Sequence, residues 1–89
     1  MARIWLNGEV VEEEDARIPV LDRAVLYGDG IFETLRAYDG SPFRLERHLR
    51  RLKEACDVLR LEQPWKDRDI AEAISLLYRE NVGSGDAYV

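Results

Sequence analysis

The sequence predicts an α+β fold with a mainly antiparallel sheet and two amphipathic helices. Two hairpin signals, Asn7-Gly8 and Asp39-Gly40, lie in the first half of the chain, between short runs of β-forming residues. After position 45 the apolar residues recur at the 3.6-residue period of a helix. Strands that precede helices in this order are typical of α+β domains rather than of alternating α/β folds.

Composition limits the functions to be considered. The chain has 89 residues, enough for one domain or part of one, and 46% of them are hydrophobic, enough for a packed core. The net charge of −5 argues against a general nucleic-acid or membrane-surface partner. The single cysteine, Cys56, excludes an internal disulfide and argues against a cysteine metal site. Since we find neither a signal peptide nor a run of ~20 apolar residues, we expect a cytoplasmic protein without membrane spans.

The chain is predicted to begin with a hairpin whose strands cover residues 3–6 and 9–12. The acidic run over residues 12–15 is predicted to be a solvated loop. Asp22 is expected to cap a single helical turn that ends near Leu26, because its carboxylate can accept from the first free backbone N–H groups.

The clearest strand signal covers residues 31–38, with a partner strand predicted over residues 42–45. One face would carry Ile31, Glu33, Leu35 and Ala37, and the other Phe32, Thr34, Arg36 and Tyr38. On the apolar face Glu33 would be costly to bury alone, so we expect it to form an ion pair. The second face offers aromatic rings and a cation, which suit a carboxylate ligand and an ordinary exposed sheet surface equally well.

Two helices are predicted in the second half. One covers residues 46–59 and has one apolar face, formed by Leu45, Leu49, Leu52, Cys56 and Leu59. The other follows Pro64-Trp65, with Asp67 as its expected N-cap. A last strand begins at Asp86 and the sequence stops within it, so we expect residues 1–89 to be an incomplete N-terminal small domain.

Two clusters invite functional interpretations. Gly28-Asp29-Gly30 fails as a dinucleotide-binding loop, because Glu33 stands where the third glycine belongs and a strand follows instead of a helix. A basic cluster covers residues 44–53, and most of it fits a solvated helix face. However, His48 and Arg51 share the helix face next to the leucine stripe, where a guanidinium is suited to an anion such as phosphate.

Taken together, the motifs resemble a known family. They are Asp22-Arg23, Tyr27-Gly28-Asp29-Gly30-Ile31-Phe32-Glu33, Arg36, Tyr38, Gly40, Phe43, His48-Leu49 and Arg51-Leu52. This pattern, which covers essentially the whole chain, resembles the small domain of the fold-type IV enzymes that use pyridoxal 5'-phosphate (PLP). These class IV aminotransferases include branched-chain aminotransferase, D-amino-acid aminotransferase and aminodeoxychorismate lyase.

The resemblance implies roles for particular residues. Arg51 would bind the phosphate of PLP, and His48 would orient the helix or the phosphate site. Substrate-binding roles are implied for Tyr27, Phe32, Thr34, Arg36 and Tyr88. The lysine that forms the Schiff base with PLP is expected beyond Val89. We therefore expect no catalytic residue in this chain, and predict that the 89 residues alone are inactive.

The implied reaction moves an amino group between an amino acid, first of all a branched-chain one, and a 2-oxo acid, in a homodimer. Aminodeoxychorismate lyase is an alternative, because Thr34 stands where branched-chain enzymes commonly have glycine. A non-enzymatic module that binds an anion or a partner through residues 44–53 is another alternative.

Overall fold

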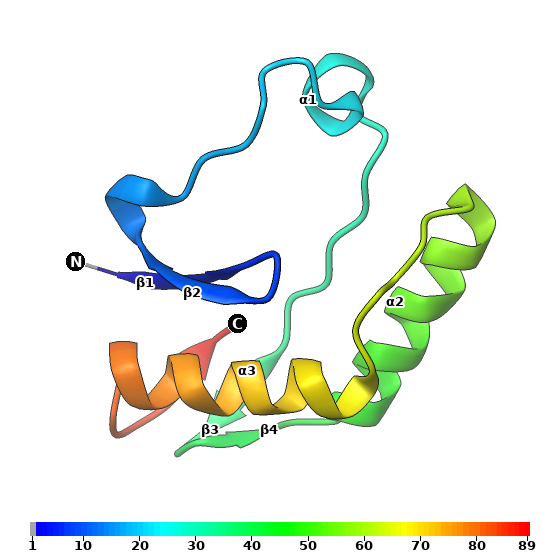
Figure 1. Cartoon of the computed structure of the whole chain (residues 1–89). Helices are drawn as coiled ribbons and strands as arrows, with labels where there is room; N and C mark the ends of the chain where they lie inside the picture. Colours follow the sequence, from blue (N-terminus) through cyan, green and yellow to red (C-terminus); the bar gives the residue numbers. More distant parts are fainter. Residues whose placement is uncertain (1) are drawn as a thin grey trace.

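The computed structural model describes residues 2–89 and confirms the α+β fold (Figure 1). Two antiparallel sheets form, one with the order β1-β2 and one with the order β4-β3-β5. In chain order the elements are β1 (Arg3–Leu6), β2 (Glu9–Glu12), the 3-10 turn η1 (Glu13–Asp15), α1 (Arg23–Tyr27), β3 (Arg36–Tyr38), β4 (Ser41–Pro42), α2 (Leu45–Leu59), α3 (Asp67–Asn81) and β5 (Ala87–Tyr88).

The first hairpin has the predicted bounds. Its turn needs two residues with positive φ, and Asn7 (φ 52°) and Gly8 (φ 92°) both adopt such angles. The prediction of a loop over residues 12–15 was wrong in part. Glu12 closes β2, and Glu13–Asp15 then form the single turn η1, with all three side chains exposed to solvent.

The predicted strand over residues 31–38 was too long, because β3 covers only Arg36–Tyr38. Before β3, Leu35 still exchanges two backbone hydrogen bonds with Val89, of 2.9 and 2.8 Å. Residues 31–34 have no neighbouring strand, yet their exposure alternates as predicted. The alternation of apolar and polar residues therefore predicted correctly which side chains are less exposed. Hydrogen-bonded strand pairing, however, requires a neighbouring strand, which the local sequence does not specify.

The partner strand was also predicted too long, since β4 contains only Ser41–Pro42. The backbone N–H of Phe43 still donates to the carbonyl of Arg36 over 2.7 Å. Arg44 then adopts a left-handed conformation, with φ 54°, and this turns the chain directly into α2.

The two long helices confirm the predicted amphipathic pattern. α2 begins one residue earlier than expected and buries Leu49 and Cys56. The expected N-cap of α3 was wrong, because Lys66 occupies that position and Asp67 is the first helical residue. The helix start is stabilised instead by Asp69, whose carboxylate accepts from the backbone N–H of Lys66 over 2.9 Å.

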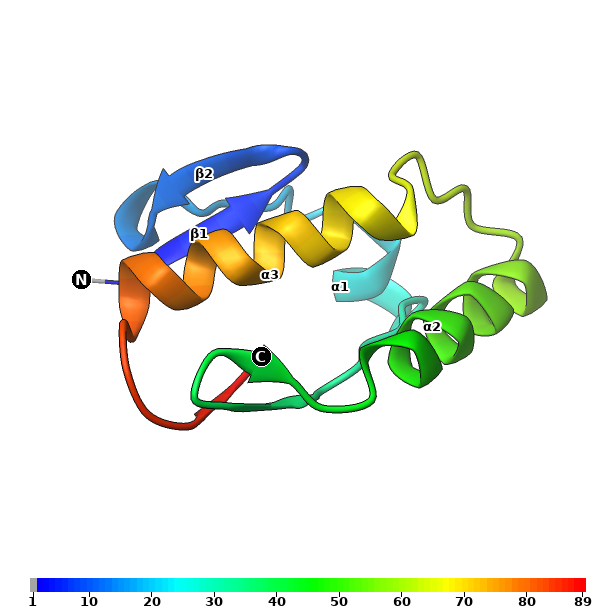
Figure 2. The same cartoon turned by 90° about the horizontal axis from the view of Figure 1, so that it is seen from below.

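Helix α3 lies between the two sheets (Figure 2). Toward β1, the side-chain amide of Asn81 exchanges two hydrogen bonds of 2.8 Å with the backbone of Arg3. Toward the other sheet, the hydroxyl of Tyr78 donates to the carbonyl of Gly85 over 2.7 Å. Gly40 approaches the Tyr78 ring so closely that an added Cβ would lie 3.0 Å from a ring carbon.

The core combines residues from β3, α2 and α3, and its smallest member is the most deeply buried. Ala37 is 1% exposed. The other buried apolar side chains are those of Leu35, Leu49, Cys56, Ala73 and Ile74. This core fixes β3 against the two helices, so the opposite face of β3 is left to solvent.

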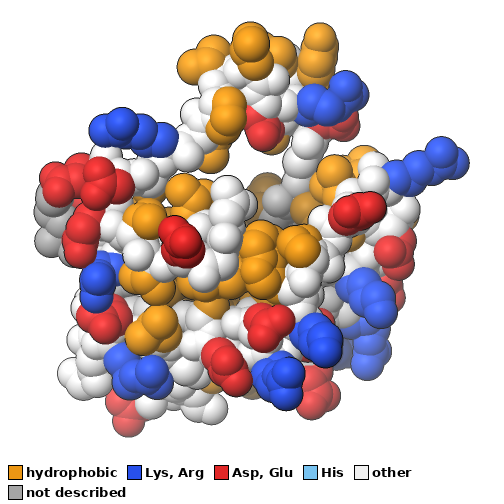
Figure 3. All heavy atoms as spheres, viewed as in Figure 1, with side chains coloured by type: hydrophobic (Ala, Val, Ile, Leu, Met, Phe, Trp, Pro, Cys, Tyr) orange, Lys and Arg blue, Asp and Glu red, His pale blue; other side chains and the backbone are white. Residues whose placement is uncertain are grey.

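The segment over residues 17–30 projects from the rest of the molecule, and every residue in it is exposed (Figure 3). Its conformation rests on local contacts. As predicted, Asp22 caps α1, and its carboxylate accepts from the backbone N–H of Ala24 over 2.9 Å. Gly28, with φ 68°, ends the turn in the left-handed conformation. Among residues 2–89, no helix is both long enough and apolar enough to cross a membrane.

Candidate functional site

The candidate site is built around two guanidinium groups. Arg51 lies on α2, and Arg36 lies on the solvent face of β3. Each of them has a carboxylate as a neighbour, and the two carboxylates differ in their burial.

At the first centre, Glu33 joins two basic side chains of α2. Its Oε2 lies 2.8 Å from Nδ1 of His48, and its Oε1 lies 3.3 Å from Nε of Arg51. The Glu33 side chain is only 18% exposed, so its charge needs a cationic partner. The contacts with His48 and Arg51 confirm the ion pair that the sequence predicted on the apolar face. His48 and Arg51 are three residues apart on one helix, so a single carboxylate can reach both.

A basic pocket lies beside this centre. It has a volume of about 450 Å³ and is lined by Arg44, Arg47, His48, Arg50 and Arg51. The Arg51 side chain remains 69% exposed although its Nε contacts Glu33. Its guanidinium is therefore accessible to a second anion, and a guanidinium fork matches the geometry of a phosphate group.

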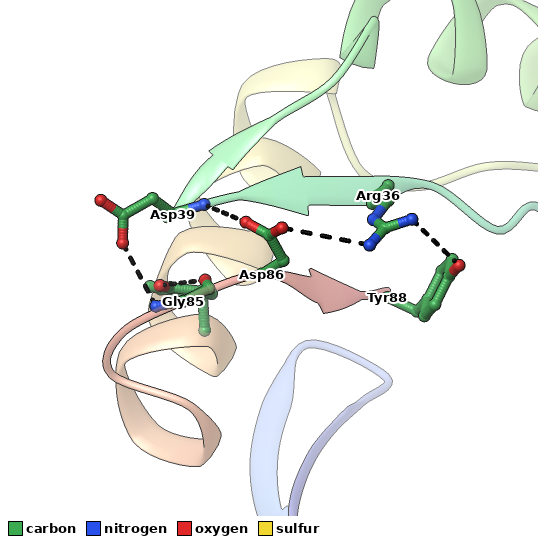
Figure 4. A network of polar contacts seen from close by, with 6 residues as sticks. Arg36, Asp39, Gly85, Asp86 and Tyr88 are labelled. Atoms are coloured by element: carbon green, nitrogen blue, oxygen red, sulfur yellow. Dashed lines mark hydrogen bonds and ion pairs between the residues drawn. The ribbon is translucent and has the colours of Figure 1, made fainter.

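At the second centre, Arg36 is held by aromatic residues. Its Nη1 donates to the hydroxyl oxygen of Tyr88 over 3.3 Å, across the register pair of β3 and β5 (Figure 4). The guanidinium carbon lies 5.1 Å from the ring centroid of Tyr88 and 5.3 Å from that of Tyr38. These contacts fix the cation between two rings on the solvent face of the central strand.

This arrangement leaves a hydrogen-bond donor free. Because Arg36 donates to the oxygen of Tyr88, the hydroxyl hydrogen of Tyr88 is directed elsewhere. Tyr88 is 72% exposed, so this hydrogen is available to an acceptor from solution. The pair thus offers a neutral donor next to a cation, and a carboxylate is a suitable ligand for both.

Acidic residues surround the far side of this centre. The carboxylate of Asp86 accepts from the backbone N–H of Asp39, and the carboxylate of Asp39 accepts from the backbone N–H of Gly85. Partial burial raises the pKa of the nearby Tyr78, and the charges of Asp39 and Asp86 raise it further. The neutral hydroxyl that donates to Gly85 is therefore the favoured form.

Of the remaining predicted site residues, two lie beside the second centre and one lies apart from both centres. Phe32, 88% exposed, and Thr34 share the solvent face with Arg36. Tyr27, however, lies on the projecting α1, where Arg23 stands 5.4 Å above its ring. Figure 1 shows α1, which carries Tyr27, apart from β3, which carries Arg36.

Sequence reasoning missed Asp86, whose carboxylate lies 4.0 Å from Arg36. A signal was present, because Asp86 stands two positions before Tyr88 and residues two apart share a strand face. This spacing places Asp86 near Arg36 only if β5 pairs with β3, and the sequence alone does not specify that pairing.

The chain is thus a small α+β protein with two accessible arginines that suit anionic ligands. Arg51 lies in a basic pocket, and Arg36 lies beside the free hydroxyl of Tyr88. Residues 30–88 match the family model described as amino-transferase class IV. The chain belongs to the class IV aminotransferase family, as its motifs predicted.

Several relatives are similar over the whole chain. An aminodeoxychorismate lyase of Bacillus subtilis is 39% identical over 97% of this chain and 30% of its own length. A D-alanine aminotransferase of Staphylococcus epidermidis is 36% identical over 100% of this chain and 32% of its own length. The chain thus spans about a third of the length of these relatives.

Among solved structures, the branched-chain aminotransferase of the archaeon Thermoproteus uzoniensis with norvaline is similar to this chain, with a TM-score of 0.88 and 33% identity. The match covers 98% of this chain and 31% of that structure. This similarity confirms the predicted α+β fold, which matches that of fold-type IV aminotransferase structures over 98% of this chain.

Proposed function

We propose that residues 1–89 form the small domain of a PLP-dependent aminotransferase. The whole protein would move an amino group from an amino acid, of the branched-chain type first of all, to a 2-oxo acid. The observation that carries the proposal is the exposed guanidinium of Arg51, which lines a basic pocket and is held by Glu33, itself in contact with His48. Membership of the class IV aminotransferase family supports the same reaction.

The side chains present fit a cofactor phosphate. Arg51 would hold the phosphate of PLP, because its guanidinium can donate two hydrogen bonds to it. The neighbouring arginines of the pocket would add positive charge around it. When bound, PLP supplies the electron sink that amino-group transfer requires. Glu33 would keep Arg51 and His48 oriented toward the pocket.

The second centre would bind the substrate carboxylate. Tyr88 would donate its free hydroxyl hydrogen to that carboxylate, and Arg36 would fix the position of the hydroxyl. Phe32 and Thr34, which share the solvent face with Arg36, would form walls for the substrate side chain. Tyr27 stays a predicted substrate-binding residue, although α1 holds it away from this face. The accessible ring of Phe32 suits the aliphatic side chain of a branched-chain amino acid.

We propose that the protein is a cytoplasmic homodimer. The projecting segment exposes large apolar side chains, among them Ile18 (61%), Val20 (75%) and Leu21 (78%). Contact with a second subunit would remove these side chains from water. The measurement is the molecular mass of the native protein in solution, and a monomer at micromolar concentration would contradict the homodimer.

An activity comparison tests the proposal. The protein that contains this chain is purified with PLP and assayed with L-leucine, D-alanine and 2-oxoglutarate. We expect amino-group transfer from L-leucine, with kcat/KM at least tenfold above that for D-alanine. A preference for D-alanine would still be aminotransferase activity, but it would contradict the branched-chain assignment. The 89-residue chain alone is expected to transfer nothing.

Aminodeoxychorismate lyase is the second candidate. The lyase of Bacillus subtilis matches at 39% identity, and Thr34 replaces the glycine expected in branched-chain enzymes. The same preparation is assayed for conversion of aminodeoxychorismate. Conversion without amino transfer from L-leucine would assign the lyase activity instead.

A further inference from the structure

Asp86 lies beside Arg36 and takes no part in the contacts that the proposed function uses. Its Oδ2 is 4.0 Å from Nη2 of Arg36, and its Oδ1 accepts from the backbone N–H of Asp39 over 3.1 Å (Figure 4). The side chains of Arg36 and Asp86 are 44% and 50% exposed. Their contact is therefore a long ion pair screened by solvent, and it leaves the guanidinium accessible.

The position of the Asp86 charge is fixed by two loops. The backbone N–H of Asp39 donates to Asp86, and the backbone N–H of Gly85 donates to the carboxylate of Asp39 over 3.2 Å. These reciprocal bonds join the β3–β4 turn to the loop before β5. Asp86 consequently stands on the same face as Tyr88, next to the place where a carboxylate would bind.

A carboxylate ligand at Tyr88 would experience both neighbouring charges. Arg36 attracts it, and the negative charge of Asp86, whose carboxylate lies 4.0 Å from Arg36, repels it. At exposed sites each effect is modest, and salt reduces both. The repulsion is larger for a ligand with two carboxylates, because each of them carries a negative charge.

We propose that Asp86 is a specificity-determining residue that sets the net charge of the Arg36–Tyr88 carboxylate site. Its charge lowers the affinity of the site for carboxylates, and most of all for dicarboxylates. This inference rests on the proposed function, since it takes Arg36 and Tyr88 as the binding site of the substrate carboxylate.

The test measures binding rather than turnover. The PLP-loaded protein that contains this chain is titrated calorimetrically with isocaproate, a monocarboxylate, and with glutarate, a dicarboxylate. In Asp86→Asn the amide oxygen can still accept from the backbone N–H of Asp39, so the variant removes the charge and retains this hydrogen bond. We expect isocaproate to bind about threefold more tightly and glutarate about tenfold more tightly at low ionic strength. At ~0.5 M salt both gains should fall below about twofold.

Matched variants separate charge from structure. Asp86→Glu keeps the charge, and its dissociation constants should stay within about twofold of the wild type. Asp39→Asn removes a charge from the adjoining turn, and the gain should be smaller than in Asp86→Asn. Weaker or unchanged binding in Asp86→Asn, or a gain that salt does not reduce, would overturn the inference.

Tyr88→Phe tests the proposed carboxylate site separately from the proposed role of Asp86. If Tyr88→Phe weakens isocaproate binding while Asp86→Asn changes nothing, the role of Asp86 is wrong and the carboxylate site stands. If Tyr88→Phe leaves both dissociation constants unchanged, the carboxylate site of the proposed function is wrong, and the inference is wrong with it.

Discussion

The two arginine centres differ in the burial of their acidic partners. Glu33, 18% exposed, contacts Arg51 at 3.3 Å and also His48 at 2.8 Å. Asp86, 50% exposed, lies 4.0 Å from Arg36 and makes its shorter contact with a backbone N–H group. A half-buried carboxylate needs its cations, because burial alone would penalise its charge. An exposed carboxylate does not, so its charge is free to modulate a binding site.

The comparison also separates what each arginine contributes. Arg51 lies among other basic residues, so it suits a ligand group with high negative charge. Arg36 lies between two rings with a carboxylate nearby, so it suits a single carboxylate. Four predictions test this division, and they follow in order of decreasing effect.

The largest effect is expected at the proposed phosphate site around Arg51. Arg51→Ala should raise the dissociation constant for PLP by about 30- to 150-fold, since it removes about 2–3 kcal/mol of charge-assisted hydrogen bonding. Titration of the whole protein, followed by cofactor absorbance, measures this constant. Arg50→Ala is the matched control, because Arg50 lines the same pocket without contacting Glu33 in the described residues. If both variants lost the same affinity for PLP, Arg51 would have no specific role in phosphate binding beyond its contribution to the positive charge of the pocket.

The next effect concerns stability at the first centre. Glu33→Gln should lower the free energy of unfolding by about 1–2 kcal/mol, because it weakens two charge-assisted contacts at a half-buried position. Urea denaturation of the whole protein measures the change. Glu54→Gln on the exposed face of α2 should change it by less than about 0.5 kcal/mol. If the two variants were equally stable, the contrast between the two centres would disappear.

A smaller effect is expected at the second centre. Arg36→Lys keeps the charge but loses the planar group that lies between the rings of Tyr38 and Tyr88. Isocaproate should then bind about fivefold more weakly, as measured by calorimetry. Arg44 also stacks on a single ring, that of Phe43, so Arg44→Lys is the control and should change binding less than about twofold. A larger loss in the control would place the carboxylate elsewhere.

The smallest effect is a pH dependence near the second centre. Partial burial, then Asp39 and Asp86, raise the pKa of Tyr78 above its ordinary value of 10.0. Between the unfolded and the folded pKa the folded state binds more protons, so stability contributed by Tyr78 is present below pH 10 and is lost as the pH rises. Urea midpoints at increasing alkaline pH should fall more steeply in the wild type than in Tyr78→Phe. Parallel curves would contradict this role.

The sequence predicted those elements whose signals are local. The turn at Asn7-Gly8 and the N-cap at Asp22 depend on the residues themselves and their immediate neighbours, and both were confirmed. The leucine pattern of α2 similarly placed that helix to within one residue. Predictions that depended on a distant partner were less accurate. The strand over residues 31–38 was too long because hydrogen-bonded pairing needs a neighbour, and β5 reaches only its C-terminal part.

The alternating pattern also determined, from the sequence alone, that Glu33 would lie on the buried face and Arg36 on the exposed one. Only the tertiary structure decided which groups they meet. Glu33 finds His48 fifteen positions later, and Arg36 finds Tyr88 fifty-two positions later. Hydrophobic periodicity and turn chemistry act over a few residues, whereas these contacts exist because α2 lies beside Glu33 and β5 pairs with β3.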